Sequence, residues 1–192
     1  MRLEVELKFP VPDLGPVVAR LVELGAEISP PQEEVDRYYA HPARNFAQTD
    51  EALRIRRKGE QCFLTYKGPK LDQSTKTRQE IDLTLPTGPD TFAAWDALLQ
   101  ALGFRPVAEV RKQRRKAFLA WQGDRVEISL DEVAELGYFV ELELRSDQAG
   151  WDWARSALFD LAHRLGLSQS ERRSYLELLW EKRTIQPPNT RQ

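Results

Sequence analysis

The chain of 192 residues carries 28 Lys and Arg against 30 Asp and Glu, which gives a formal net charge of −2. This length suits one domain with a sizeable core, and the near balance of charge argues against bulk binding of nucleic acid. One cysteine, Cys62, excludes an internal disulfide and indicates a reducing, cytoplasmic compartment. No apolar run is long enough to span a membrane, so a membrane protein is not expected.

Short segments in which apolar and charged residues alternate recur along the chain. In residues 3–9, Glu4, Glu6 and Lys8 alternate with apolar neighbours, which predicts a strand with one charged face. Further strands are predicted, in chain order, at residues 34–39, 52–58, 62–67, 78–85, 107–119, 125–131 and 138–145. Residues 68–77 are polar and are predicted to form a loop.

Apolar residues at helical spacing predict four helices. The first three are expected at residues 14–24, 91–102 and 153–165. Asp13 and Asp90 are candidate N-caps of the first two, and Ser168 with Glu171 matches a capping box for the fourth. Residues 184–192 are polar with two prolines, which predicts a disordered tail after a single domain at 1–183.

The predicted elements favour an α+β fold with a closed barrel. Each amphipathic helix needs an apolar surface to cover, and the apolar faces of the strands are the surfaces available. Eight short antiparallel strands commonly close into a barrel. We therefore expect an eight-stranded antiparallel β-barrel with flanking helices, in which the charged strand faces line the lumen.

The expected lumen carries charges of both signs, and they are separated along the sequence. The acidic candidates are Glu4, Glu6, Glu80, Asp131, Glu141 and Glu143, and the basic candidates are Lys8, Arg54, Arg56, Lys67, Arg78, Lys112 and Arg114. A dry interior would cost several kcal/mol per unpaired ion, so the lumen must be wet or filled by a ligand. Carboxylates without His or Cys suit Mg²⁺ or Mn²⁺, and Arg with Lys suits a polyanion such as a nucleotide or polyphosphate.

The start of the chain, Glu4-x-Glu6-x-Lys8, resembles the signature of the CYTH superfamily of triphosphate tunnel metalloenzymes. The resemblance continues in order through residues 53–56 (LRIR), 64–69 (LTYKGP), 78–80 (RQE), 112–114 (KQR), 130–131 (LD) and 141–143 (ELE). Residues 65–70 and 130–141 are most similar to the class IV adenylyl cyclase branch. One departure is Phe118, because the family often has a tyrosine soon after its Lys-x-Arg pair.

The resemblance implies an eight-stranded tunnel that acts on a triphosphate with Mg²⁺ or Mn²⁺. It implies Glu4, Glu6, Asp131, Glu141 and Glu143 as metal ligands. It implies Lys8, Arg54, Arg56, Lys67, Arg78, Lys112 and Arg114 as triphosphate-binding residues, with Lys8, Lys67 and Lys112 in catalytic roles.

Three functional hypotheses remain open from the sequence. The favoured one is a class IV adenylyl cyclase that converts ATP into cyclic AMP and pyrophosphate. The others are a triphosphatase acting on inorganic or thiamine triphosphate, and a non-catalytic polyphosphate-binding module. The expected partner is a nucleoside triphosphate or another triphosphate, and a homodimer stays open.

Overall fold

The computed structural model describes residues 3–71, 78–146 and 150–185. The described strands are β1 (Leu3–Val11), β2 (Glu27–Ile28), β3 (Gln32–Ala40), β4 (Ala52–Lys58), β5 (Gln61–Lys70), β6 (Arg78–Thr84), β7 (Arg105–Trp121), β8 (Asp124–Val133) and β9 (Gly137–Ser146). The described helices are α1 (Gly15–Glu23), α2 (Phe46–Thr49), α3 (Thr91–Ala101), α4 (Trp151–Arg164) and α5 (Tyr175–Ile185). No helix in these ranges is long and apolar enough to cross a membrane.

The described strands form one antiparallel sheet that closes on itself. Its order is β2-β7-β3-β4-β5-β6-β1-β9-β8, and a further pairing of β7 with β8 completes an eight-stranded barrel. The two-residue strand β2 lies outside this ring and pairs with β7 alone among the described strands. The predicted barrel is therefore confirmed, with one short strand that the sequence pattern did not indicate.

The apolar faces of the strands point outward and are covered by helices. One core lies under α1 and α4 and includes Leu7, Ile128, Leu142 and Leu158. A second core lies on the opposite side of the barrel, beneath α3 and α2, and is built around residues such as Ile55. Because alternate side chains point to opposite faces, burying these residues directs the charged ones into the lumen.

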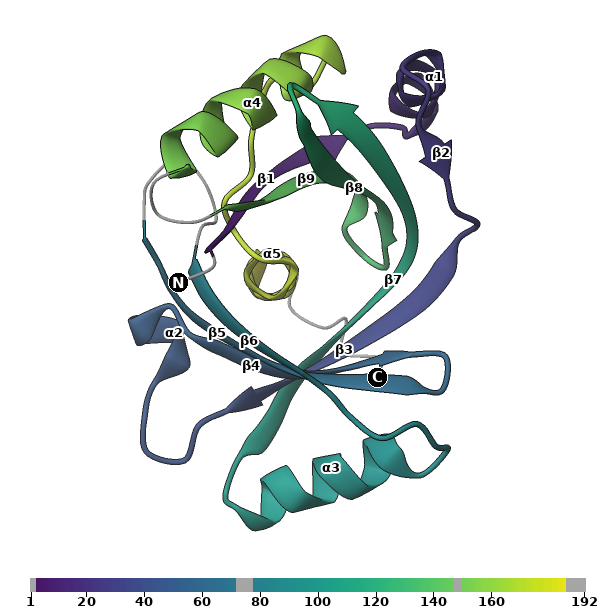
Figure 1. The fold of residues 1–192 in the computed structure, drawn as a ribbon. Helices are drawn as coiled ribbons and strands as arrows, with labels where there is room; N and C mark the ends of the chain where they lie inside the picture. Colours follow the sequence, from purple (N-terminus) through teal and green to yellow (C-terminus); the bar gives the residue numbers. More distant parts are fainter. Residues whose placement is uncertain (1–2, 72–77, 147–149, 186–192) are drawn as a thin grey trace.

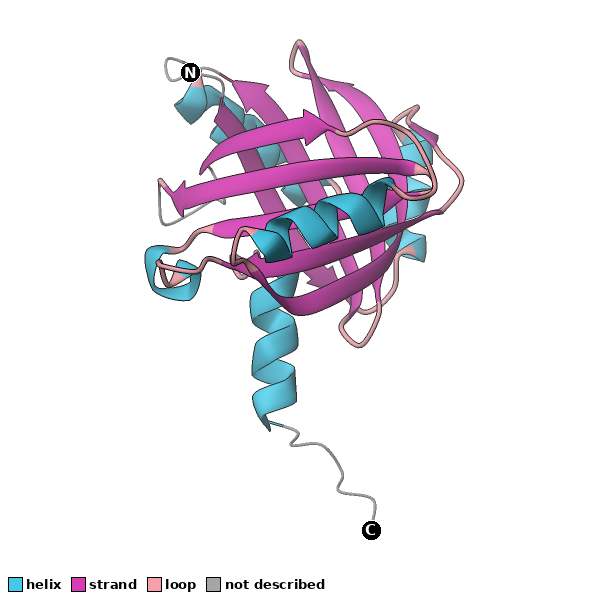
Figure 2. Ribbon diagram, turned by 90° about the horizontal axis from the view of Figure 1, so that it is seen from below, coloured by secondary structure: helices cyan, strands magenta, loops and turns pink. Residues whose placement is uncertain are grey.

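Helix α5 enters the barrel instead of covering its outside, and Figure 1 shows it end-on within the ring of strands. Its residues Tyr175, Leu176 and Leu179 pack against apolar residues of the inner face, among them Val110 and Phe139. The other end of α5 stands out from the barrel, as Figure 2 shows. The lumen is therefore apolar where α5 enters it, a feature that the expected charged strand faces did not include.

Several predicted boundaries and caps are corrected by the structure. The capping box of the last helix is formed by Ser174 and Glu177, since Ser174 Oγ accepts from Glu177 N at 3.1 Å and Ser174 N donates to Glu177 Oε2 at 2.6 Å. Ser168 and Glu171 lie before that helix. The N-cap residue of α1 is Leu14, but Asp13 Oδ1 accepts from Gly15 N, the first amide of that helix, at 2.9 Å. Asp90 is the N-cap residue of α3 and makes no side-chain hydrogen bond there.

Two predicted irregular segments are partly ordered. Strand β5 continues to Lys70, which pairs with Arg78 after a register shift, so residues 68–70 of the predicted loop belong to the strand, whereas residues 72–77 lie outside the described residues. Helix α5 runs to Ile185, and residues 186–192 of the predicted tail also lie outside the described residues.

Candidate active site

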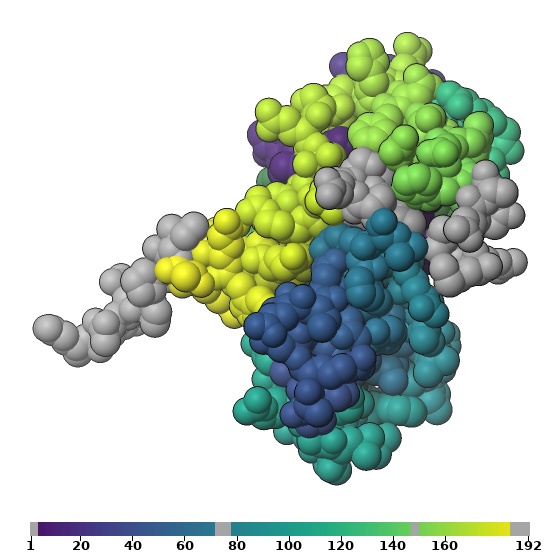
Figure 3. All heavy atoms as spheres, turned by 90° about the vertical axis from the view of Figure 1, so that its left-hand side faces the viewer, coloured from purple at the N-terminus to yellow at the C-terminus, as the bar shows by residue number. Residues whose placement is uncertain are grey.

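The lumen contains a cavity of about 940 Å³. Among the described residues, its lining holds eleven acidic and eleven basic side chains, which come from all eight barrel strands and from the segments around α2 and α5. Figure 3 shows α5, in yellow, emerging beside the α2 segment, in dark blue. A lining whose acidic and basic side chains balance can bind a cation and an anion together.

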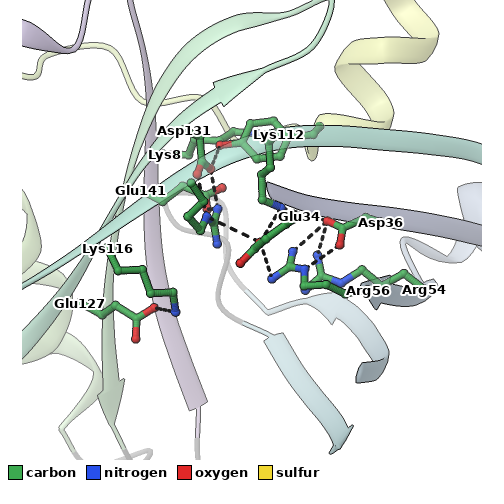
Figure 4. Close-up of polar contacts among 12 residues, drawn as sticks. Lys8, Glu34, Asp36, Arg54, Arg56, Lys112, Lys116, Glu127, Asp131 and Glu141 are labelled. Atoms are coloured by element: carbon green, nitrogen blue, oxygen red, sulfur yellow. Dashed lines mark hydrogen bonds and ion pairs between the residues drawn. The ribbon is translucent and has the colours of Figure 1, made fainter. Parts of the chain in front are cut away.

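The basic side of the cavity is organised by Asp36 on β3, a residue that the sequence analysis did not include in the site. Asp36 is fully buried, and its two carboxylate oxygens accept from Arg56 Nε at 2.6 Å and Arg56 Nη2 at 2.8 Å. Lys112 Nζ and Arg54 Nη1 approach the same carboxylate at 3.0 and 3.3 Å. Although burial raises the pKa of Asp36, these cations hold it well below its usual value. Figure 4 shows this convergence.

Glu34 lies two residues earlier on β3 and faces the same cluster. Its Oε2 atom lies 3.2 Å from Lys112 Nζ, 3.3 Å from Arg56 Nη1 and 3.9 Å from Arg114 Nε. Burial raises the pKa of Glu34, but Arg56, Lys112 and Arg114 outweigh that effect and lower it to about 2. The carboxylate is therefore ionised at neutral pH and neutralises part of the basic side.

Arg114 on β7 links the basic side to two of the predicted metal ligands. Its Nε donates to Asp131 Oδ1 at 2.6 Å, and its Nη2 contacts Asp131 and also Glu141 Oε2, the latter at 2.5 Å. The Tyr175 hydroxyl donates to Asp131 Oδ2 at 2.7 Å, which leaves Asp131 fully buried behind α5. In this structure Asp131 therefore positions Arg114 and does not line the cavity.

Lys8 is also separated from the cavity by the segment that leads into α5. It is 1% exposed, and its ammonium donates to the backbone oxygen of Arg173. The same nitrogen lies 4.2 Å from the centroid of the Tyr175 ring and 5.4 Å from that of Phe139. Among the predicted triphosphate-binding residues, Lys8 alone is absent from the described lining.

The acidic side lies across β1, β9 and β8, where strand register places carboxylates in one row. Glu6 lies opposite Glu143, and Glu143 lies opposite Glu127. Directly opposed like charges are unfavourable. Burial, followed by the charge of Glu4, raises the pKa of Glu143 to about 8, and burial with the charge of Glu80 raises that of Glu4 to about 7.

The remaining predicted cations complete the basic side near this row. Lys67 Nζ forms an ion pair with Glu80 Oε1, and Arg78 Nη1 donates to the backbone oxygen of Gly68 at 3.3 Å. Lys116 similarly pairs with Glu127. Acidic partners therefore already hold Lys67 and Lys116 at the positions where they line the cavity.

A divalent cation fits the chemistry of the acidic side. Glu4, Glu6 and Glu143 line the cavity as oxygen donors of the kind that Mg²⁺ and Mn²⁺ prefer. Burial and neighbouring carboxylates raise the pKa values of Glu4 and Glu143, although Arg145 lies 3.3 Å from Glu4 and 3.7 Å from Glu143. In the described part of the chain, no three acidic, His or Cys side chains are already gathered closely enough to hold a metal. Binding would therefore require these flexible side chains to converge.

Comparisons with known proteins agree with this architecture. The CYTH domain model matches residues 2–175. A Methanocaldococcus jannaschii protein named putative adenylate cyclase is 35% identical over 179 residues, which are 92% of this chain and 98% of that protein. The PH1819 protein of Pyrococcus horikoshii is 42% identical with a TM-score of 0.82, and the match covers 94% of this chain and 99% of that one.

A third protein with this fold is a putative adenylyl cyclase from Hippeastrum, described as having a dominant triphosphatase activity. It is 17% identical to this chain with a TM-score of 0.64, over 95% of this chain and 96% of its own. The match to the CYTH domain over nearly the whole chain, together with the archaeal relatives, shows that this protein belongs to the CYTH family.

Proposed function

We propose that this protein is a class IV adenylyl cyclase that converts ATP into cyclic AMP and pyrophosphate with Mg²⁺ or Mn²⁺. The observation that carries the proposal is the cavity itself, in which a row of carboxylates and a group of Arg and Lys side chains line one tunnel. A nucleoside triphosphate bound to divalent metal presents the matching charges, because the metal suits the carboxylates and the phosphates suit the cations.

Six of the predicted triphosphate-binding residues line the cavity, and in the proposal they contact the phosphate oxygens. They are Arg54, Arg56, Lys67, Arg78, Lys112 and Arg114. In the proposal, Lys67 and Lys112 stabilise the charge that develops on the phosphates during the reaction. Lys8 joins them only if the backbone oxygen of Arg173 releases it, which requires the segment before α5 to move.

In the proposal, Glu4, Glu6 and Glu143 would hold the metal, with Glu141 reaching it after release from Arg114. Asp131 contributes indirectly by orienting Arg114. When bound, the metal would neutralise phosphate charge. The protein then has to hold the triphosphate in line with its nucleophile and to limit the access of water.

The proposed reaction is an in-line displacement at the α-phosphorus. The ribose 3′-oxygen forms a bond to that phosphorus while the bond to the bridging oxygen of the β-phosphate breaks. Pyrophosphate leaves, and the hydroxyl proton passes to a carboxylate of the lumen. Cationic side chains around the phosphates stabilise the charge on the leaving pyrophosphate.

The size and lining of the cavity favour a nucleotide over a bare triphosphate. Cavities for organic ligands range from about 300 to 1,000 Å³, so about 940 Å³ leaves room for a whole nucleotide. Beyond the phosphate-binding cations, the lining continues over residues 41–47 and reaches Leu176 and Trp180 of α5, which could contact a nucleoside. The second candidate, a triphosphatase, is supported by the activity described for the Hippeastrum protein.

The deciding experiment measures products from purified protein incubated separately with ATP, inorganic triphosphate and thiamine triphosphate, each with Mg²⁺ or Mn²⁺. We expect cyclic AMP and pyrophosphate in equal amounts from ATP. Orthophosphate from inorganic triphosphate without cyclic AMP from ATP would replace the cyclase with the triphosphatase. Metal-dependent binding without any product would leave a binding module.

A further inference from the structure

Three cationic groups of the basic side converge on one carboxylate oxygen. Glu34 Oε2 lies 3.2 to 3.9 Å from Lys112 Nζ, Arg56 Nη1 and Arg114 Nε, and Figure 4 shows the side chain directed into this group. The three cations come from β4 and β7 and all line the cavity. Together they form a cup of positive charge, which we call the cation cup.

The contacts of Glu34 differ in kind from those of Asp36. Asp36 accepts well-aligned hydrogen bonds from Arg56 and Lys112 at 2.6 to 3.0 Å, and therefore holds these cations in place. Glu34 Oε2 is buried and has no hydrogen-bond partner among the described residues, so its attraction to the cup is mainly coulombic. The three cations keep Glu34 ionised, but its Oε2 makes no aligned hydrogen bond to any of them, so an anion with more acceptor oxygens could bind the same cations more completely.

We propose that Glu34 is an internal competitor of the substrate, occupying in the ligand-free tunnel the position in the cation cup that one phosphate group takes. This inference rests on the proposed function, because it takes the ligand to be a triphosphate. It assigns to Glu34 the role of setting the affinity of the tunnel for that triphosphate. A phosphate group offers more charge and more acceptor oxygens than a carboxylate, and neighbouring phosphates can contact Arg54 and Lys67 at the same time. Glu34 is 2% exposed and lines the cavity, and in the proposal its side chain rotates along the lumen when a phosphate group takes its place.

The competitor also has a role in the ligand-free protein. Lys112 and Arg114 are buried and Arg56 is partly buried, and like charges packed together without an anion would destabilise the barrel. Glu34 therefore stabilises the ligand-free tunnel and at the same time weakens binding of the ligand. Residues at functional sites often show such an opposition between stability and function.

The test is to measure binding of inorganic tripolyphosphate to the full-length protein by calorimetry, with EDTA present so that metal plays no part. We expect Glu34→Gln to bind tripolyphosphate roughly tenfold more tightly than the wild type, because the competing charge is gone. The same variant should melt at a lower temperature without ligand and gain more in melting temperature on adding tripolyphosphate. Glu34→Asp keeps the charge but shortens the side chain by one methylene, and should show a smaller gain of the same sign.

Two matched variants separate competition from a general effect of charge. Glu33→Gln changes the exposed neighbouring residue on β3, and Asp82→Asn removes a carboxylate elsewhere in the lumen. Both should change the affinity much less than Glu34→Gln. Binding by the wild type with equal or weaker binding by both Glu34 variants would overturn the inference alone. Absence of binding in every protein in EDTA would overturn the inference, and absence of binding after Mg²⁺ replaces the EDTA would overturn the proposed function as well.

Discussion

The two sides of the tunnel both contain glutamates, but the pKa of the glutamate is raised on one side and lowered on the other. Glu143, on the acidic side, lies opposite Glu6 and Glu127, and its pKa is raised to about 8 by burial and by the charge of Glu4. Glu34, on the basic side, lies among Arg56, Lys112 and Arg114, and its pKa is lowered to about 2 despite burial. Cations therefore dominate around Glu34, whereas burial and neighbouring carboxylates outweigh the nearby Arg145 around Glu143.

This difference indicates what each side is prepared to bind. On the basic side, internal carboxylates already hold the cations at the lumen, so an anion has to compete for them. On the acidic side, a cation would relieve repulsion that the exposed Arg145, 3.3 Å from Glu4 and 3.7 Å from Glu143, compensates only in part. A metal–triphosphate complex supplies both missing charges, which is why the comparison predicts separate and measurable effects for each side.

The largest effect is expected from removing charge on the acidic side. The double variant Glu4→Gln with Glu6→Gln should lower metal-dependent turnover by roughly a hundredfold or more, because neutral amides hold a divalent cation poorly. Circular dichroism and the melting temperature at neutral pH should remain close to those of the wild type, since repulsion in the acidic row also falls. Unchanged turnover would remove the metal-binding role, and a lost circular-dichroism signal would make these residues structural.

On the basic side, Arg56→Ala should weaken binding of tripolyphosphate by roughly 1.5–3 kcal/mol, the range for a charge-assisted contact. Arg57→Ala is the matched control, because Arg57 is the exposed neighbour on the same strand and points to the other face. Equal affinities of the two variants would contradict the assignment of faces on β4. Ile55→Ala, by contrast, should lower stability by about 2–5 kcal/mol with no direct effect on binding, since Ile55 is fully buried in the outer core.

A smaller effect should appear in the pH dependence of stability without metal. Since the pKa of Glu143 is about 8 in the folded protein against 4.5 as its ordinary value, the folded state retains a proton that the unfolded state loses. Stability should therefore fall as pH rises from about 4.5 to about 8.

Thermal melts of the wild type and Glu143→Gln in EDTA measure this contribution. The variant should lose less stability over that range, by a few degrees in melting temperature. In the wild type, Mg²⁺ should raise the melting temperature more at the upper end of the range, because metal competes with the proton. Parallel curves for the two proteins would show that Glu143 is not the group responsible.

Alternation along single strands was enough to predict the barrel and the inward direction of most charged residues. It worked because each strand buries one face under a helix, so that a period of two assigns every side chain to the core or the lumen. Glu34 and Asp36 follow the same alternation on β3, within the strand predicted at residues 34–39. The sequence analysis did not identify Glu34 and Asp36 as site residues. A carboxylate that holds cations and a carboxylate that binds metal show the same alternation in sequence.

The position of α5 could not be predicted from local pattern. An apolar stripe shows that a helix packs on something, but does not distinguish the outer face of a sheet from the inside of a barrel. The position of α5 also affects the site. Tyr175 contacts Asp131, and the Arg173 carbonyl contacts Lys8, and both Asp131 and Lys8 were expected in the lumen. Those side chains are inward as predicted, but α5 and the segment before it stand between them and the cavity.

The smallest effect we predict concerns the anchoring of this helix beside the basic side. Ser174→Ala should destabilise the protein by about 1 kcal/mol, because it removes the hydroxyl that accepts from the Glu177 backbone nitrogen at the start of α5. Ser168→Ala removes the hydroxyl of the capping box that the sequence suggested, and should change stability by less than about 0.5 kcal/mol. Chemical denaturation of the two variants measures the difference directly. If α5 also limits access of substrate to Lys8 and Asp131, Ser174→Ala should bind tripolyphosphate at least as tightly as the wild type, whereas a loss of affinity would mean that an ordered α5 is itself part of the binding site.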